Sequence, residues 1–172
     1  MAVTVVETVG SASANAFVSV AEADAYLEAR LNSSAWAGTE PKKQAIIEAT
    51  RELSAINWQG YRVDTTQALS WPRYNAPNPD STSCLEVFAT TVIPQRIKDA
   101  TCELALEFLR LGTTDAAALD STAGVIEETV GPLTTRWADP SQRAAGLGRY
   151  PRVQKLIAPL LGIGSGQVRL TR

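Results

Sequence analysis

An apolar side chain recurs every three or four residues from Ile97 to Leu111, which is the spacing of one face of an α-helix. Ile93-Pro94 predicts the start of this helix. Gly112 predicts its end, because glycine readily takes the left-handed backbone conformation that often follows a last helical turn. A helix with one apolar face needs other elements packed against that face. The pattern therefore predicts a helical core, with the inward residues Ile97, Ala100, Thr101, Leu104, Ala105, Phe108 and Leu111.

Three further helices are predicted, beginning at Ser19, at Thr39 and at Pro151. Ser19 and Glu22 have the spacing of a capping box, in which each side chain accepts a hydrogen bond from the other residue's backbone amide. Apolar residues recur at helical spacing in all three segments. The inward residues expected there are Ala23, Leu27 and Leu31, then Ile46, Ala49, Leu53 and Ile56, then Val153, Leu156, Ile157 and Leu160.

The remaining segments predict strands and arms. Residues 125–137 predict a β-hairpin, and the β-branched residues at 3–9 predict a short strand. The 172 residues fit one domain. We predict a mainly α fold: a small helical bundle of three main helices plus a short C-terminal helix, with a β-hairpin and extended terminal arms. The bundle spans residues 19–161, between an N-terminal arm (1–18) and a C-terminal arm (162–172).

Charge is unevenly divided along the chain, although the net charge is only −2. Residues 1–135 hold 9 basic and 17 acidic side chains, a net −8, whereas residues 136–172 hold 7 basic and 1 acidic, a net +6. Such a division is typical of a chain whose basic end has a partner. That partner is either nucleic acid or an acidic protein surface, including the surface of a neighbouring copy.

Histidine is absent, which removes the commonest general base and the commonest metal ligand. With Cys84 and Cys102 as its two cysteines, one chain cannot build a four-cysteine zinc site, and Cys102 is expected to be a buried thiol. Glu103 and Glu107 lie one helical turn apart, on what the pattern predicts to be a solvated face. We therefore expect no enzyme activity, no catalytic residue, no cofactor and no bound metal. The absence of a run of about 18 apolar residues predicts that no membrane is involved.

Aromatic and arginine side chains gather between residues 58 and 74, and two interpretations of them stay open. Proteins that bind single-stranded DNA interleave aromatic rings with arginine, and each stacked base contributes about 1–3 kcal/mol. Alternatively, the rings pack in the core or at a subunit interface. The acidic surroundings favour this second interpretation, because affinity for DNA depends largely on neutralising phosphates. The residues of this loop cluster are Trp58, Tyr61, Arg62, Trp71, Pro72, Arg73 and Tyr74.

Several motifs together resemble the head–tail connector proteins of tailed bacteriophages, also called adaptor or head-completion proteins. The resemblance rests on Glu7, the block at 14–26 (Ala-Asn-Ala-Phe-Val-Ser-Val-Ala-Glu-Ala-Asp-Ala-Tyr), Trp36 and Leu69-Ser70-Trp71-Pro72-Arg73. It continues through Ile93-Pro94, the third helix, the turn at 130–132 and the last helix with its tail, and so covers about residues 7–172. One branch of this family is described as DnaT-like single-stranded-DNA-binding proteins.

The resemblance implies a structural virion protein without catalysis. Family members form a ring, usually a dodecamer, in the neck of the phage at the head–tail interface. The implied partners are further copies of the chain, the portal protein, a tail-side neck or tail-terminator protein, and genomic double-stranded DNA that passes through the channel without tight binding. An acidic body suits such a conduit because it does not attract phosphates. Before assembly the protein is expected in the host cytoplasm.

The C-terminal arm is the expected portal-binding segment, because it is basic and alternates polar with apolar residues, as an added strand does. The alternative function is a single-stranded-DNA-binding module that uses the loop cluster. The residues expected to bind the portal are Gly164, Gln167, Val168, Arg169, Leu170 and Arg172.

Overall fold

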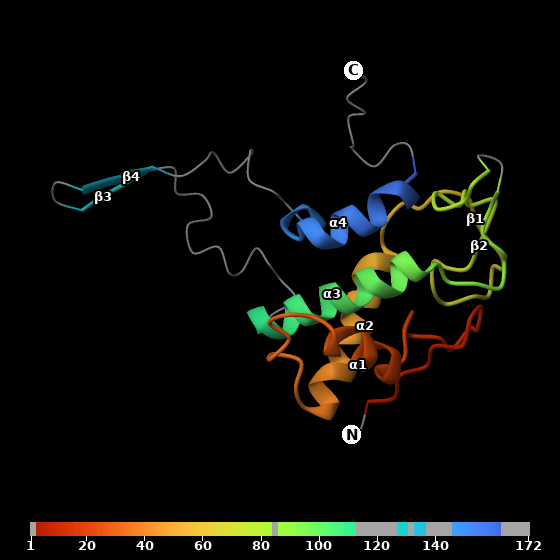
Figure 1. Ribbon diagram of the computed structural model, residues 1–172, viewed down its shortest axis with the longest axis horizontal. Coiled ribbons are helices and arrows are strands. Elements are labelled where there is room, and N and C mark those ends of the chain that lie inside the picture. Colours follow the sequence, from red (N-terminus) through yellow and green to blue (C-terminus); the bar gives the residue numbers. More distant parts are fainter. Residues whose placement is uncertain (1–2, 84–85, 113–126, 131–132, 137–145, 163–172) are drawn as a thin grey trace, which may run out of the picture.

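The computed structural model describes residues 3–83, 86–112, 127–130, 133–136 and 146–162, and it confirms the predicted mainly α fold class (Figure 1). The described α-helices are α1 (Val20–Glu28), α2 (Thr39–Ser54), α3 (Gln95–Leu111) and α4 (Pro151–Ile157). Two 3₁₀ turns, η2 (Gly146–Arg149) and η3 (Ala158–Leu160), flank α4. The strands form two antiparallel pairs, β1 (Tyr61–Arg62) with β2 (Arg73–Tyr74), and β3 (Glu127–Val130) with β4 (Leu133–Arg136).

Helix α3 lies at the centre of the body and contacts α1, α2 and α4 (Figure 1). Its buried surface is wider than the predicted stripe, because Cys102, Glu103 and Leu106 are buried as well. Three neighbouring helices surround α3, so one apolar face does not account for all of its contacts. The predicted inward position of Leu111 is wrong: this side chain ends the helix and is 39% exposed.

The predicted signals at two helix ends are confirmed. Ser19 Oγ accepts from the Glu22 amide at 3.1 Å, and Glu22 Oε2 accepts from the Ser19 amide at 3.0 Å, which completes the capping box of α1. Gly112 ends α3 with a φ of 68° and donates its amide to the Phe108 carbonyl at 2.9 Å. Helix α1 ends one turn earlier than predicted, so Leu31 is 81% exposed instead of inward.

Residues 3–9 do not form the strand predicted there, because Val6 hydrogen-bonds to the side chain and the backbone of Asn15 instead of to a neighbouring strand. The Val6 amide donates to Asn15 Oδ1 at 2.7 Å, and the Asn15 amide donates to the Val6 carbonyl at 2.8 Å. Ala16, Phe17 and Val18 are each at most 1% exposed. The end of the predicted N-terminal arm therefore packs into the core, while the domain limits at 18 and 162 stay predictions.

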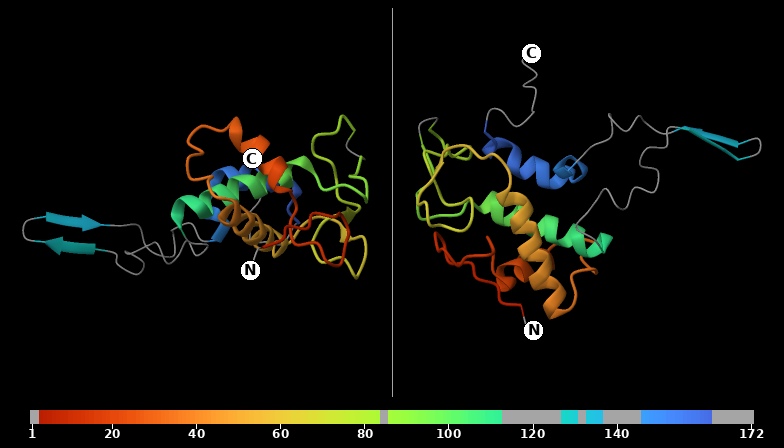
Figure 2. Two further views of the ribbon diagram at one scale, coloured as in Figure 1. Left: turned by 90° about the horizontal axis from the view of Figure 1, so that it is seen from below. Right: turned by 180° about the vertical axis from the view of Figure 1, so that it is seen from behind.

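Strands β3 and β4 form the hairpin predicted at 125–137, with Glu127 opposite Arg136. Arg136 Nε donates to Glu127 Oε2 at 2.7 Å across the pair. Among the described residues the hairpin contacts no helix, and Figures 1 and 2 show it standing apart from the helical body. Because an isolated two-stranded hairpin is marginally stable in water, its stability depends on contacts with something other than the described helices.

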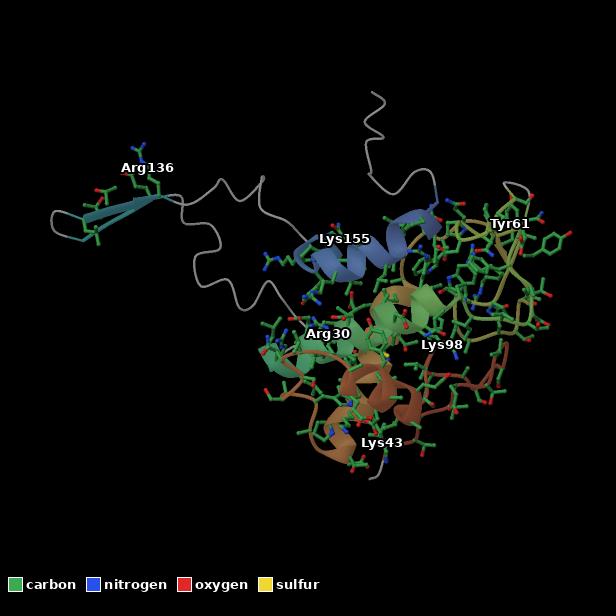
Figure 3. The ribbon with its side chains drawn as sticks, in the orientation of Figure 1. Arg30, Lys43, Tyr61, Lys98, Arg136 and Lys155 are labelled. Carbon is green, nitrogen blue, oxygen red and sulfur yellow. The ribbon has the colours of Figure 1, made fainter. Side chains whose placement is uncertain are left out.

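Glu103 is not the solvated carboxylate predicted from the helical pattern. It is 4% exposed, and Arg30 donates two hydrogen bonds to its carboxylate, from Nε at 2.8 Å and from Nη2 at 3.2 Å. The Tyr26 hydroxyl donates to the same carboxylate at 3.2 Å. Burial, followed by the charge of Glu103, raises the pKa of Tyr26. This ion pair ties α1 and the turn after it to the centre of α3 (Figure 3).

We expect Glu103→Ala to lower the free energy of unfolding by about 3 kcal/mol, because it leaves the Arg30 guanidinium largely buried without its carboxylate. Urea unfolding followed by circular dichroism measures this loss. Glu107→Ala is the matched control on the same helix, since its ion pair with Arg110 is more exposed and contributes at most about 1 kcal/mol. Equal losses in the two variants would contradict the structural role of the buried pair.

Candidate nucleic-acid interface

The loop cluster comes together at one end of the body, where the chain leaves α2 and returns toward α3 (Figure 1). The pairing of β1 with β2 places Tyr61 opposite Tyr74 and Arg62 opposite Arg73. Successive side chains of a strand point to opposite faces, so the two tyrosines share one face and the two arginines share the other. The strand pair thereby separates an aromatic face from a basic face.

The two tryptophans of the cluster are core residues. Trp58 is 2% exposed and Trp71 is 1% exposed, and their rings meet edge to face with centroids 6.0 Å apart. Trp71 makes a similar contact with Phe88 at 5.9 Å, and Trp58 Nε1 donates to the Leu53 carbonyl at 2.9 Å. Pro72 is buried beside them. These rings cannot stack on DNA bases in the folded protein, so they act in packing.

The two tyrosines are the aromatic side chains of the cluster that solvent reaches. Tyr61 is 73% exposed and Tyr74 is 57% exposed. Figure 3 shows Tyr61 directed away from the helices, at the end of the body. Because the register puts these side chains next to each other on one face, they form an exposed aromatic surface of the kind on which bases stack. We call this surface the tyrosine pair.

The arginines of the cluster are held by backbone carbonyl groups. Arg73 donates to the carbonyls of Gln59 and Gly60 at 2.7 and 2.6 Å, while Arg62 Nη2 donates to the carbonyls of residues 67–69. Neither guanidinium forms an ion pair with a carboxylate of the described residues. Burial, followed by the nearby charge of Arg62, lowers the pKa of Arg73. Both positive charges are thus fixed in position without being neutralised.

Elsewhere in the described chain, most basic side chains are paired with carboxylates. These ion pairs join Arg30 to Glu103, Lys42 to Asp24, Lys43 to Glu40, Arg51 to Glu48, Arg96 to Asp80, Lys98 to Glu22, Arg110 to Glu107 and Arg136 to Glu127. Arg152 and Lys155, exposed on α4, form no ion pair with a described carboxylate. Residues 146–162 contain no acidic side chain. Unpaired positive charge therefore concentrates in the loop cluster and on α4.

Hydrogen bonds join the chain after α4 to the segment before β1. The Gln59 amide donates to the Leu160 carbonyl at 3.0 Å, and the Gly162 amide donates to the Asn57 carbonyl at 2.9 Å. The chain after α4 therefore runs beside the segment that leads into β1, as the two opposite views of Figures 1 and 2 show. A ligand on the loop cluster has α4 as its neighbour.

Other chemistries find little support in the described residues. No group of three or more histidine, cysteine, aspartate or glutamate side chains gathers there as a metal site. Cys102 is buried as predicted, and burial raises the pKa of its thiol to about 12, so it is not a nucleophile near neutral pH. None of the described helices combines the length and the apolar character needed to cross a membrane.

The structure brings the seven predicted cluster residues together, but it also uses residues that the sequence analysis missed. Ser54, the last residue of α2, and Ser70, in the loop, lie beside Arg62 and Arg73. Ser70 lies in the motif Leu69-Ser70-Trp71-Pro72-Arg73, but nothing in the sequence pairs it with Ser54, because the two become neighbours only when the loop folds back onto the end of α2. The predicted portal-binding residues at 164–172 lie outside the described residues.

A comparison with protein-family models finds one described as "Putative DnaT-like ssDNA binding protein", which matches residues 1–172. No curated protein matches the chain, and no solved structure does.

Gly60 shapes the turn into β1, and we expect Gly60→Ala to disrupt the cluster. The φ of Gly60 is 73°, and a Cβ there would lie 2.4 Å from the Tyr74 carbonyl oxygen and 2.8 Å from the Ala76 amide nitrogen. We expect the free energy of unfolding to fall by more than about 1 kcal/mol. Unfolding followed by tryptophan fluorescence measures this loss. Gly112→Ala is the matched control, because φ there is 68° but nothing lies within 4 Å. Similar losses in both variants would mean that the close approach at Gly60 is unimportant.

Proposed function

The chain belongs to the family of DnaT-like single-stranded-DNA-binding proteins, and from this premise we propose that it binds single-stranded DNA on the loop cluster. The observation that carries the proposal is the tyrosine pair, Tyr61 and Tyr74, exposed on one face of a strand pair whose other face carries two arginines that no described carboxylate neutralises. In this proposal the tyrosines stack on bases, and the arginines attract the backbone phosphates.

Stacking suits an exposed tyrosine pair because every base has an aromatic face, whatever the sequence of the strand. Each stacked base contributes about 1–3 kcal/mol. The register of β1 and β2 holds the backbones of the two tyrosines opposite each other, and each ring has only two side-chain torsions to order when a base binds, which limits the loss of conformational entropy. The proposed binding is therefore tolerant of DNA sequence.

The charge distribution supports a modest, salt-sensitive affinity. Arg62 and Arg73 lie in the cluster, whereas Arg152 and Lys155 lie on α4, and Leu160 in the η3 turn after α4 is hydrogen-bonded to Gln59 beside the cluster. Binding to single strands weakens with salt in proportion to the number of phosphates neutralised, with a slope of about −0.7 per contact. Two such side chains in the cluster favour micromolar affinity at low salt rather than tight binding.

A ring-forming head–tail connector is the second candidate function, and the hairpin of β3 and β4 favours it. The hairpin contacts no described helix and needs a partner for stability, which a neighbouring copy in a ring would supply. A closed ring joins two different patches of each subunit, and an acidic body with a basic C-terminal part offers two such patches. In this candidate the protein would reside in the virion neck and contact the portal, a tail-side protein and the passing genome. Neither candidate requires catalysis.

We expect the full chain to bind a fluorescein-labelled oligo-dT, with affinity that falls steeply as salt is raised. Tyr61→Ala and Tyr74→Ala should each weaken binding by about five-fold or more, because each removes one stacking surface. Tyr61→Phe should bind like the unmodified chain, since phenylalanine keeps the ring. Fluorescence anisotropy measures all of these affinities.

Leu31→Ala serves as the control for the anisotropy experiment, because Leu31 is an exposed apolar residue (81%) outside the loop cluster. It should leave binding unchanged. If both tyrosine-to-alanine variants bind like the unmodified chain, or if that chain shows no salt-sensitive binding, the proposed function is wrong.

The connector candidate predicts a closed ring, alone or with portal protein, whose mass is a multiple of the 18.4 kDa of one chain. Light scattering coupled to size exclusion measures this mass. Replacing residues 127–136 by a flexible linker should abolish the ring while the helical circular dichroism persists, because the hairpin contacts no described helix. A monomer under both conditions would exclude this candidate.

A further inference from the structure

A hollow of about 280 Å³ lies on the basic side of the loop cluster, between the end of α2 and the loop. Its wall includes Ser54, Asn57 and Ser70 together with the arginines Arg62 and Arg73. None of the described residues that line it is acidic. The hollow therefore combines hydroxyl groups with positive charge, a lining that matches an oxyanion.

The two serine hydroxyls in this wall are buried and unpartnered. Ser70 is 9% exposed, and neither Ser54 Oγ nor Ser70 Oγ has a hydrogen-bond partner among the described residues. A buried hydroxyl without a partner destabilises the folded state, so such groups in a pocket point to a ligand that accepts their hydrogen bonds. Both serines line the same hollow as the arginines.

The arginines add donors and unbalanced charge to the same space. The hydrogen bonds of Arg62 use Nη2, so its Nε and Nη1 groups donate to no described acceptor. Burial, and after it the positive charge of the nearby Arg62, lowers the pKa of Arg73. An anion between the two guanidiniums would balance their like charges and accept hydrogen bonds from the unused N–H groups of Arg62.

We propose that this hollow, which we call the serine–arginine pocket, binds a phosphate group from the backbone of a DNA strand. The inference rests on the proposed function and deepens it. The strand pair places the arginines on the face opposite the tyrosine pair, so a bound strand would pass around the pair, with one phosphate in the pocket and the bases of other nucleotides on Tyr61 and Tyr74. A phosphodiester has two non-bridging oxygens, which match the donors of two arginines and two serines.

The first test uses inorganic phosphate and the full chain. Phosphate should raise the melting temperature more than sodium chloride of equal ionic strength, because it binds the folded state only. Ser54→Asp places a carboxylate in the pocket and should abolish this phosphate-specific shift, whereas the neutral and similarly shaped Ser54→Asn should retain it. No phosphate-specific shift in the unmodified chain, or an unchanged shift in Ser54→Asp, would overturn the proposal.

The second test uses labelled oligo-dT and separates this inference from the proposed function. Ser70→Ala removes a hydroxyl that has no described partner, so the fold should persist while affinity for oligo-dT falls by about ten-fold, as expected for one hydrogen bond to a charged group. If oligo-dT binds through the tyrosine pair but Ser70→Ala and Ser54→Asp bind it unchanged, the pocket inference fails and the proposed function stands. If inorganic phosphate binds but oligo-dT does not, the assignment to a DNA strand is wrong.

Discussion

The edge-to-face contact between Trp58 and Trp71 joins the end of α2 to the loop that carries the candidate site, and the geometry of that site depends on it. With Trp71 packed in the core, the residues that follow it are drawn against the chain leaving Trp58, so β2 can pair with β1. Arg73 then reaches the carbonyls of Gln59 and Gly60 from one face of the pair, and the tyrosines are directed to the other face. Buried rings thus determine where the exposed rings lie.

An acidic chain can still present a basic surface, because most of the described basic residues and their carboxylate partners neutralise each other. Lys98, for example, pairs with Glu22 at the start of α1, and Lys42 pairs with Asp24. Arg62 and Arg73 differ because carbonyl oxygens hold them, and a carbonyl carries no net charge to cancel that of the guanidinium. Net charge is therefore a poor guide to where an anion binds on this molecule, and the distribution of pairs is a better one.

The helices could be predicted from the sequence because their signals are local: apolar spacing, the capping box at Ser19 and the glycine after α3. The same local signals misplaced Glu103, since its burial depends on Arg30, which lies 73 residues away in the sequence. The local sequence signals also identified the loop cluster, but they did not indicate which of its aromatic side chains are exposed. The sequence leaves stacking and packing open for all four rings, whereas the structure buries Trp58 against the end of α2 and leaves Tyr61 exposed. Long-range packing of this kind leaves no periodic trace in the sequence.

The two candidate functions make opposite demands on the tyrosine pair. A conduit for double-stranded DNA must let the genome slide, so Tyr61 and Tyr74 would have to be covered by a neighbouring subunit or directed away from the channel. A single-strand binder needs the same rings exposed in its working state. If copies of the chain assembled with these rings exposed toward DNA, many weak sites would act together, and their combined affinity would greatly exceed that of one pocket. Such a ring would hold a single strand rather than let it pass. Whether β1 and β2 direct Tyr61 and Tyr74 toward the DNA or away from it therefore decides between the two functions.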